Sequence, residues 1–238
     1  MSLDRLASLV KFLQIKTVSA PPLRDAGFFV LKNKDGYVLA TSSHGVQSDT
    51  ILAVRFSNTG ALDSLLTAVG CHSHPVAPED AIYPILELCV AELQRPRCGA
   101  ETLMAGYAEV LLIHFLRSAI EFGRAEVGVL AGLSDPRLSR ALVAIHDQPG
   151  RNWNTDDLAA VAGMSRSVFM ARFRAVMGDP PMGYLRQWRL ARARDEIIAG
   201  ARVNEVALRY GYGSADAFAR AFRKAEGVSP SDLRRQAA

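Results

Sequence analysis

The chain has 238 residues, of which 49% are hydrophobic and 22% charged, and its net charge is +4. This length and composition allow one large domain or two of ordinary size, with enough apolar sequence for a core in each. Residues 1–134 hold 11 basic and 13 acidic side chains, whereas residues 135–238 hold 17 and 11, so the C-terminal half is the cationic one.

The N-terminal half predicts a mixed α+β domain. Residues 4–16 have the spacing of a short amphipathic helix, and β-rich runs follow them. The turn sequence Asn33–Gly36 joins the first two runs and suits a hairpin. In chain order, the remaining predicted elements are strands at Gly27–Leu31, Tyr37–Thr41 and Ile51–Phe56, helices at Pro78–Gln94 and Ala100–Phe122, and a linker at Gly128–Ser134.

The sequence favours a cytoplasmic protein that does not enter a membrane. Its first residues carry charges and no cleavage-like site, so we expect no secretory signal. The longest apolar stretch, Thr102–Ile120, is interrupted by Glu109, His114 and Arg117, which favours a buried helix, with His114 in the core. The three cysteines are an odd number in a chain without an export signal, so reduced thiols are expected.

The C-terminal half contains the same unit twice. The first copy is LAAVAGMSRSVFMARFRAVMGDPP (Leu158–Pro181), and the second is VALRYGYGSADAFARAFRKAEGVSP (Val206–Pro230). Matching residues recur 48 positions later before the turn and 49 positions later after it. The turn is where one added residue is best tolerated. Each copy has the form of a helix-turn-helix, and the pair predicts a protein that reads DNA through two recognition helices.

Glycines and aromatic residues indicate how each copy folds. Gly163 and Gly211 suit the left-handed turn that ends the first helix of each unit. Phe169 and Phe173 lie four residues apart on one helical face, as do their counterparts in the second copy, so these faces are predicted to form two cores. Between the copies, Met182–Ala199 fits a long helix that holds the two units at a fixed spacing.

Asp135-Pro136 is a good helix start, because it offers a capping side chain followed by proline in the first turn. From this point to residue 238, the sequence resembles the DNA-binding domain of the AraC/XylS transcription regulators. The sequence GYGSADAFARAFRKAEGVSPSDLR carries the resemblance, together with the earlier copy and the connecting helix. The resemblance implies seven helices, with recognition helices that enter successive major-groove segments. Leu233 departs from the family, which usually has an aromatic residue before the final Arg234, and this should alter local packing only.

Residues 1–134 are predicted to be a regulatory and dimerisation domain. Family members of this layout carry a small cupin-like β-barrel before a pair of helices, and Pro78–Trp153 is similar to that helical part. The short region before the helices lacks a His-rich strand pair, so a closed barrel and a partial cupin-like sheet both remain open. The expected fold is mainly α, with an all-α domain of two helix-turn-helix units joined by a long helix and an α+β domain.

The resemblance and the outward helix faces together select the candidate DNA-binding residues. Arg220 is the long donor among the matched base-facing positions, which suits it to guanine, whereas Arg174 and Arg223 are placed for phosphate. The whole set is Ser165, Arg166, Ser167, Met170, Ala171, Arg174, Ser214, Ala215, Asp216, Arg220 and Arg223. We predict no catalytic residue, metal ligand or cofactor.

Several side chains invite other interpretations. Cys71–His74 combines thiolate and imidazole ligands that could bind a soft metal, although a fourth ligand is missing and an exposed loop is the simpler alternative. Cys89 and Cys98 could form a redox pair or be two ordinary thiols. Trp153 and Trp188 are predicted to be packing anchors rather than platforms for stacked bases.

The sequence therefore predicts a non-enzymatic, sequence-specific transcription regulator that binds double-stranded operator DNA. The alternatives are a cupin-type metalloenzyme with an accessory DNA-binding domain, and a non-specific architectural DNA binder. The resemblance implies RNA polymerase as a partner, and a small-molecule effector is a further candidate partner. The apolar stripes of the helices at Pro78–Gln94 and Ala100–Phe122 either pack on the sheet or form a homodimer contact or an effector pocket. We favour the homodimer, because it would place four recognition helices on DNA.

Overall fold

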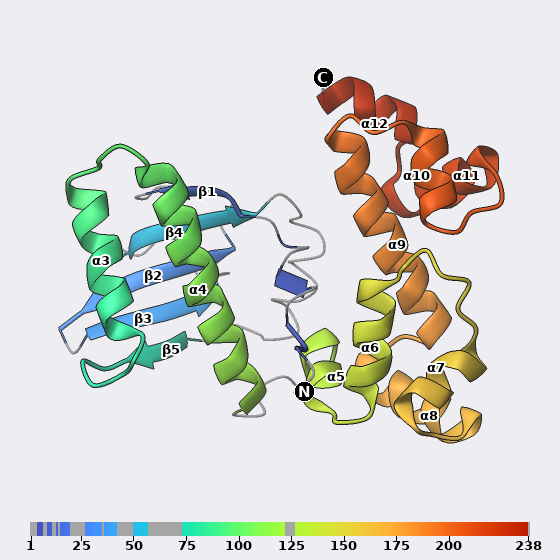
Figure 1. The fold of residues 1–238 in the computed structure, drawn as a ribbon, viewed down its shortest axis with the longest axis horizontal. Helices are drawn as coiled ribbons and strands as arrows, with labels where there is room; N and C mark the ends of the chain where they lie inside the picture. The colour runs from blue at the N-terminus through green and yellow to red at the C-terminus, as the bar shows by residue number, and fades with distance from the viewer. Residues whose placement is uncertain are drawn as a thin grey trace. The chain divides into compact units, whose positions relative to one another are not determined.

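The computed structural model describes residues 4–6, 9–10, 13, 15–19, 27–34, 36–41, 50–56, 73–121 and 127–237 (Figure 1). The chain divides into two compact units. One, which we call the sheet unit, is Leu13–Ser134. The other, the helical unit, is Asp135–Ala238 together with Met1–Phe12.

The sheet unit is built on five antiparallel strands in the order β1-β4-β2-β3-β5. Their bounds are β1 Ile15–Ser19, β2 Phe28–Asn33, β3 Gly36–Thr41, β4 Thr50–Phe56 and β5 Ser73–Val76. The three predicted strands are confirmed as β2, β3 and β4, whereas β1 and β5 were not predicted. In the described residues β1 and β5 are the two ends of this order, so the sheet is open and matches the partial sheet rather than a closed barrel.

The predicted hairpin is also confirmed, because Asn33 pairs with Gly36 where β2 meets β3. Gly36 has a φ of 141°, and a Cβ there would lie 2.6 Å from the carbonyl oxygen of Val76 on β5. A glycine is therefore required, because β5 approaches the turn too closely for a side chain. Along β3, half-buried and buried residues alternate, as expected for a strand with one face in a core.

Two helices cover one face of the sheet, α3 at Tyr83–Gln94 and α4 at Ala100–Glu121 (Figure 1). Phe115 of α4 meets Phe28 of β2 edge to face, with ring centroids 5.6 Å apart. By length and composition α4 could also cross a membrane, and 44% of its most apolar 18-residue segment is buried inside the protein. The helix predicted from residue 78 begins only at Tyr83, because Pro84 suits the first turn of a helix.

The predicted linker at Gly128–Ser134 is wrong. Residues Val129–Ser134 form a short helix, α5, whose Val129, Leu130 and Leu133 are buried. A six-residue apolar run is too short to show helical periodicity, so only its packing against α4 reveals the helix. The helix predicted over residues 4–16 also ends too late, since Ile15 already belongs to β1. Its apolar positions are nevertheless buried: Leu6, Leu9, Val10 and Leu13.

The helical unit contains seven helices within residues 135–237, as the resemblance implied. They are α6 Leu138–Asp147, α7 Thr155–Ala162, α8 Arg166–Met177, α9 Pro181–Ile198, α10 Val203–Arg209, α11 Ala215–Glu226 and α12 Pro230–Ala237. The long helix α9 runs from the first helix-turn-helix, α7–α8, to the second, α10–α11 (Figure 1).

Helix α6 is joined to α9 through a buried polar contact. His146 Nε2 and the Tyr184 hydroxyl lie 2.6 Å apart, and the His146 ring stacks on Trp188 at 4.0 Å. Burial lowers the pKa of His146 to about 3, so the ring is neutral at pH 7. Trp188 and Trp153 are both buried, which agrees with their predicted packing role.

Candidate nucleic-acid interface

The two helix-turn-helix units repeat the same backbone geometry. Gly163 and Gly211 have φ values of 65° and 76°, in the left-handed region where glycine is favoured. In each unit the residue after the glycine donates its N–H to a carbonyl at 2.9 Å, that of Ala159 in the first and that of Ala207 in the second. This bond ends the first helix and turns the chain into the recognition helix.

A pair of phenylalanines fixes how each recognition helix lies on its core. Phe169 and Phe173 of α8 are fully buried, with ring centroids 5.4 Å apart. Phe218 and Phe222 of α11 are also fully buried, and their rings are again 5.4 Å apart. Because one face of each helix is held inward, the opposite face is presented outward.

The second core also includes residues from the connecting helix. Its buried members are Leu190, Ala193, Ile197, Val206, Ala207, Tyr210, Phe218 and Phe222. Leu233, at the position where the family usually has an aromatic residue, packs partly buried against this core.

The outward face of α8 carries every residue that was predicted for it. The exposed candidates are Ser165, Arg166, Ser167, Met170, Ala171 and Arg174. Arg166 forms an ion pair with Asp156 of α7 at 2.7 Å, and both side chains are exposed. Val168, which sequence reasoning missed, is 53% exposed on the same helix. Its place outside the phenylalanine face was the signal that could have identified it.

The outward face of α11 carries the second set. Ser214, Asp216, Arg220 and Arg223 are exposed, and Ala215 is half-buried. The Ser214 hydroxyl accepts the backbone N–H three residues later at 3.1 Å, so it caps the helix. Within the described part of the chain, Arg220 has no ion-pair partner, which leaves its guanidinium fork available to a ligand.

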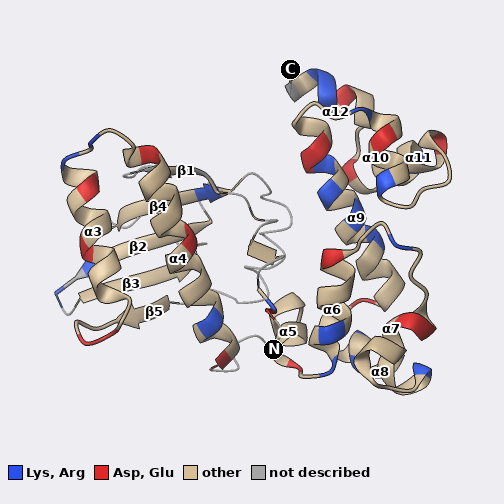
Figure 2. Cartoon of the chain, in the orientation of Figure 1, with Lys and Arg blue, Asp and Glu red and all other residues tan. Residues whose placement is uncertain are grey.

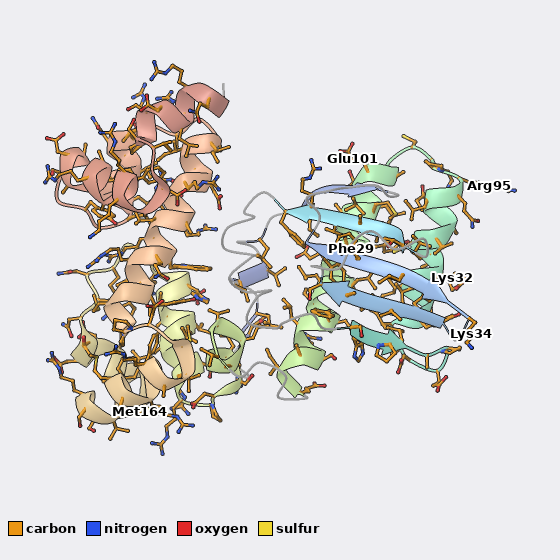
Figure 3. The ribbon with its side chains drawn as sticks, turned by 180° about the vertical axis from the view of Figure 1, so that it is seen from behind. Phe29, Lys32, Lys34, Arg95, Glu101 and Met164 are labelled. Atoms are coloured by element: carbon orange, nitrogen blue, oxygen red, sulfur yellow. The ribbon has the colours of Figure 1, made fainter. Side chains whose placement is uncertain are left out.

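Positive charge is spread over the helical unit, with arginines along α9 and on α12 (Figure 2). Part of it is neutralised internally. Arg194 of α9 pairs with Glu226 at 3.1 Å, and Arg209 pairs with Glu196. In the sheet unit, Lys32 and Lys34 lie at the end of the β2–β3 hairpin, whereas Arg95 and Glu101 lie near the α3–α4 connection (Figure 3). Charges of both signs are therefore present on the sheet unit.

The Cys71–His74 run, considered as a metal site or an exposed loop, is described from Ser73 onward, and Ser73 and His74 lie in strand β5 rather than in a loop. Among the residues that the structure describes, no group of three metal-ligating side chains is found. His74 bonds to Ser118 at 2.8 Å and lies beside His114, with ring centroids 5.8 Å apart. Cys71 and His72 lie outside the described residues. His114 is only half-buried, and is a neighbour of another imidazole rather than an isolated core residue.

The described cysteines differ in their surroundings. Cys89 is buried on α3 and Cys98 is exposed in the following loop, and both are free thiols in the described part of the chain. Burial raises the pKa of Cys89 to about 12, which makes it a poor thiolate at pH 7. This favours two ordinary thiols over a redox pair.

Comparison with known proteins places the similarity in the helical unit. A family model described as a helix-turn-helix domain matches residues 158–236. A putative AraC-like transcription regulator from Streptomyces lividans is 40% identical over 139 residues, covering 57% of this chain and 46% of that protein. The HTH-type transcriptional activator AarP of Providencia stuartii is 30% identical over 95 residues, covering 40% of this chain and 70% of that protein.

Among solved structures, the DNA-binding domain of AdpA in complex with a target DNA is 32% identical, with a TM-score of 0.40, over 43% of this chain and 92% of that chain. The chain spans about half the length of the first curated relatives it matches. The names of these relatives do not support the alternative of a cupin-type metalloenzyme.

Proposed function

Because this chain belongs to the AraC family of helix-turn-helix transcription regulators, we propose that it binds double-stranded operator DNA sequence-specifically through α8 and α11. The observation that carries the proposal is the repeated geometry: each recognition helix is held by a buried phenylalanine pair and exposes its opposite face. Residues 135–238 are the proposed DNA-binding domain, and residues 1–134 are the proposed regulatory and dimerisation domain.

The two recognition helices belong to one chain, so one monomer should cover two successive major-groove segments. Their centres should lie one helical turn, about 34 Å, apart. The two half-sites should differ in sequence, because the outward faces of α8 and α11 differ. Selection of binding sites from random DNA with the full chain, followed by footprinting, tests this. Protection of a single groove segment would contradict the proposal.

Base readout by α11 should depend on Arg220. Its planar fork can donate two bonds to guanine O6 and N7, which is worth about 1–3 kcal/mol of discrimination. Arg220→Ala should therefore flatten preference at one or two base pairs of the α11 half-site. Arg223→Ala is the matched control: without this phosphate-binding side chain, affinity should fall for all sequences alike and the salt slope should decrease by about one unit. Unchanged base preference in Arg220→Ala would refute the assignment.

The α8 half-site should contribute less discrimination. Ser167, Met170 and Ala171 offer short or apolar groups, and Val168 adds another exposed apolar side chain. Such groups suit thymine methyls and cannot form the bidentate pairings that distinguish guanine or adenine. A saturation scan of the selected operator should place the steepest losses under α11, and the reverse pattern would overturn this ranking.

The sheet unit is our candidate for dimerisation. Most of the apolar stripe predicted for this purpose on α3 is buried inside the unit, including Leu86 and Cys89. Leu88 of α3 stays 53% exposed, and two members of the apolar stripe predicted on α4 stay exposed as well, Leu103 at 39% and Val110 at 42%. Sedimentation of the full chain, alone and with operator DNA, tests whether a homodimer forms. A small-molecule effector, contact with RNA polymerase and a cytoplasmic location are parts of the same proposal and rest on family membership.

A further inference from the structure

The two helix-turn-helix units meet at a junction centred on Arg189, in the middle of α9. Its Nε donates to the carbonyl of Pro149 at 2.7 Å, and its Nη2 donates to the carbonyl of Arg151 at 2.8 Å. Both acceptors lie in the loop between α6 and α7, which leads into the first helix-turn-helix. One guanidinium therefore attaches that loop to the helix that connects the two units.

The second unit approaches the same loop through its own turn. A Cβ at Gly150 would lie 2.0 Å from the carbonyl oxygen of Arg209, at the end of α10. A Cβ at Gly211 would lie 3.0 Å from the carbonyl oxygen of Gly150 and 3.2 Å from Arg189 Nη2. The loop before the first helix-turn-helix and the turn of the second are thus in close backbone contact beside Arg189. A side chain at Gly150 would collide with the Arg209 carbonyl, and one at Gly211 would require its neighbours to shift.

This junction has little freedom to slide. The planar fork of arginine donates in fixed directions, so its two bonds define one orientation of the loop. On the other side, Glu196 of α9 accepts from the Tyr210 hydroxyl at 2.7 Å and pairs with Arg209, which holds α10 against the same helix. Close-packed contacts of this kind have discrete arrangements and do not deform continuously.

We propose that Arg189 is a positioning residue which, together with the close contacts at Gly150 and Gly211, holds α8 and α11 at one distance and angle. The protein then accepts only one spacing between its two DNA half-sites. This inference rests on the proposed function. One base pair more or less between the half-sites moves the second groove segment by about 3.4 Å and rotates it by about 35°. A rigid junction cannot follow that displacement, whereas a loosened one can.

The test uses the full chain and the selected operator, with one base pair inserted or removed between the half-sites. Arg189→Lys keeps the charge but cannot form the forked pair of bonds. Gly150→Ala, in the loop between α6 and α7, adds a methyl group that would lie 2.0 Å from the carbonyl oxygen of Arg209 and so forces the two backbones apart. Arg186→Lys is the matched control, an exposed arginine one turn earlier on α9. Equilibrium binding is measured for each protein on each spacing, and circular dichroism checks the folded state.

We expect the wild type and Arg186→Lys to bind operators with altered spacing at least about tenfold more weakly. Following the displacement would break at least one charge-assisted hydrogen bond of the junction, and tenfold is the scale of one such bond. In Arg189→Lys and Gly150→Ala this penalty should fall below about threefold, with base preference inside each half-site unchanged. Retention of the wild-type spacing profile, or an equal loss of base preference, would overturn the proposal.

Unfolding of both variants would also contradict the inference, because neither substitution removes a side chain from the two phenylalanine cores. A wild-type protein that selects no bipartite site would instead refute the proposed function, whatever the variants do.

Discussion

Asp135 offers a quantitative test of how the helical unit begins. Its carboxylate is 6% exposed, and its Oδ1 accepts the backbone N–H groups of Arg137 at 2.8 Å and Leu138 at 3.0 Å. Its Oδ2 accepts from Arg172 Nε of α8 at 2.5 Å. One side chain thus caps the backbone N–H groups at the start of α6 and also ties this helix to the first recognition helix. The Asp-Pro sequence predicted the cap but not the contact with α8.

The expected cost of Asp135→Ala follows from these contacts. Loss of a helix cap costs about 1–2 kcal/mol. The Arg172 side chain is 54% exposed, so solvent screening limits the ion pair to about 0.5 kcal/mol. We therefore expect Asp135→Ala to lower the free energy of unfolding by about 2 kcal/mol and Arg172→Ala by about 0.5 kcal/mol. Asp135→Asn, which keeps an acceptor and loses the charge, should fall between them.

The cost should also depend on pH. Burial by itself raises the pKa of Asp135, but the hydrogen bonds from Leu138 and Arg137 and the contact with Arg172 outweigh it, so the pKa is lowered. A lowered folded-state pKa contributes stability that is present above the unfolded value, about 3.9, and is lost as the pH falls through the folded value. The difference between wild type and Asp135→Ala should be full at neutral pH and shrink in acid.

Urea denaturation of the full chain, followed by circular dichroism at several pH values, measures both effects. The Asp135→Ala, Arg172→Ala double variant completes a cycle that isolates the ion pair. A cost for Arg172→Ala equal to that for Asp135→Ala would show that the ion pair, and not the cap, carries the stability. A difference that stays constant on acidification would refute the ionised, hydrogen-bonded carboxylate.

Three further predictions concern single side chains. Phe218→Ala should lower the free energy of unfolding by about 3–5 kcal/mol in urea denaturation, because it empties a fully buried site, and a loss near 1 kcal/mol would contradict that packing. Cys98 should react with a thiol reagent much faster than Cys89, and a Cys98→Ser variant that keeps the fast reaction would disprove this. Ser214→Ala should lower the free energy of unfolding, measured by thermal melting, by about 1 kcal/mol, because it removes a helix cap. Ser165→Ala should cost less, because the Ser165 hydroxyl contacts another serine and caps no backbone N–H; equal costs would count against the cap.

The local structure of the helical unit could be predicted because its signals are local. Capping residues, glycines at left-handed turns and phenylalanines four residues apart each act within one or two helical turns. The repeat then showed that both copies share a structure, and the outward faces of α8 and α11 followed from the position of the core. Val168 was missed because an apolar side chain is expected in the core, although its position lies outside the phenylalanine face of α8.

The sheet unit was less predictable, because strand pairing and short buried helices depend on distant partners. Nothing near Ile15–Ser19 in the sequence indicates that β1 pairs with β4, about forty residues later. The apolar run of α5 is compatible with a loop or a helix in sequence, and its packing against α4 selects the helix. For these elements tertiary contacts, rather than local preference, select the conformation.

By itself, the sequence determined the two helix-turn-helix units, the family and the set of outward side chains. The junction between the units was decided only in the tertiary structure. Arg189 is one of four arginines on α9, and they have the same chemistry and similar neighbours in the sequence. Its partners are the carbonyls of Pro149 and Arg151, which lie 40 and 38 residues away. Backbone carbonyls carry no sequence signature, so only folding shows which arginine meets them.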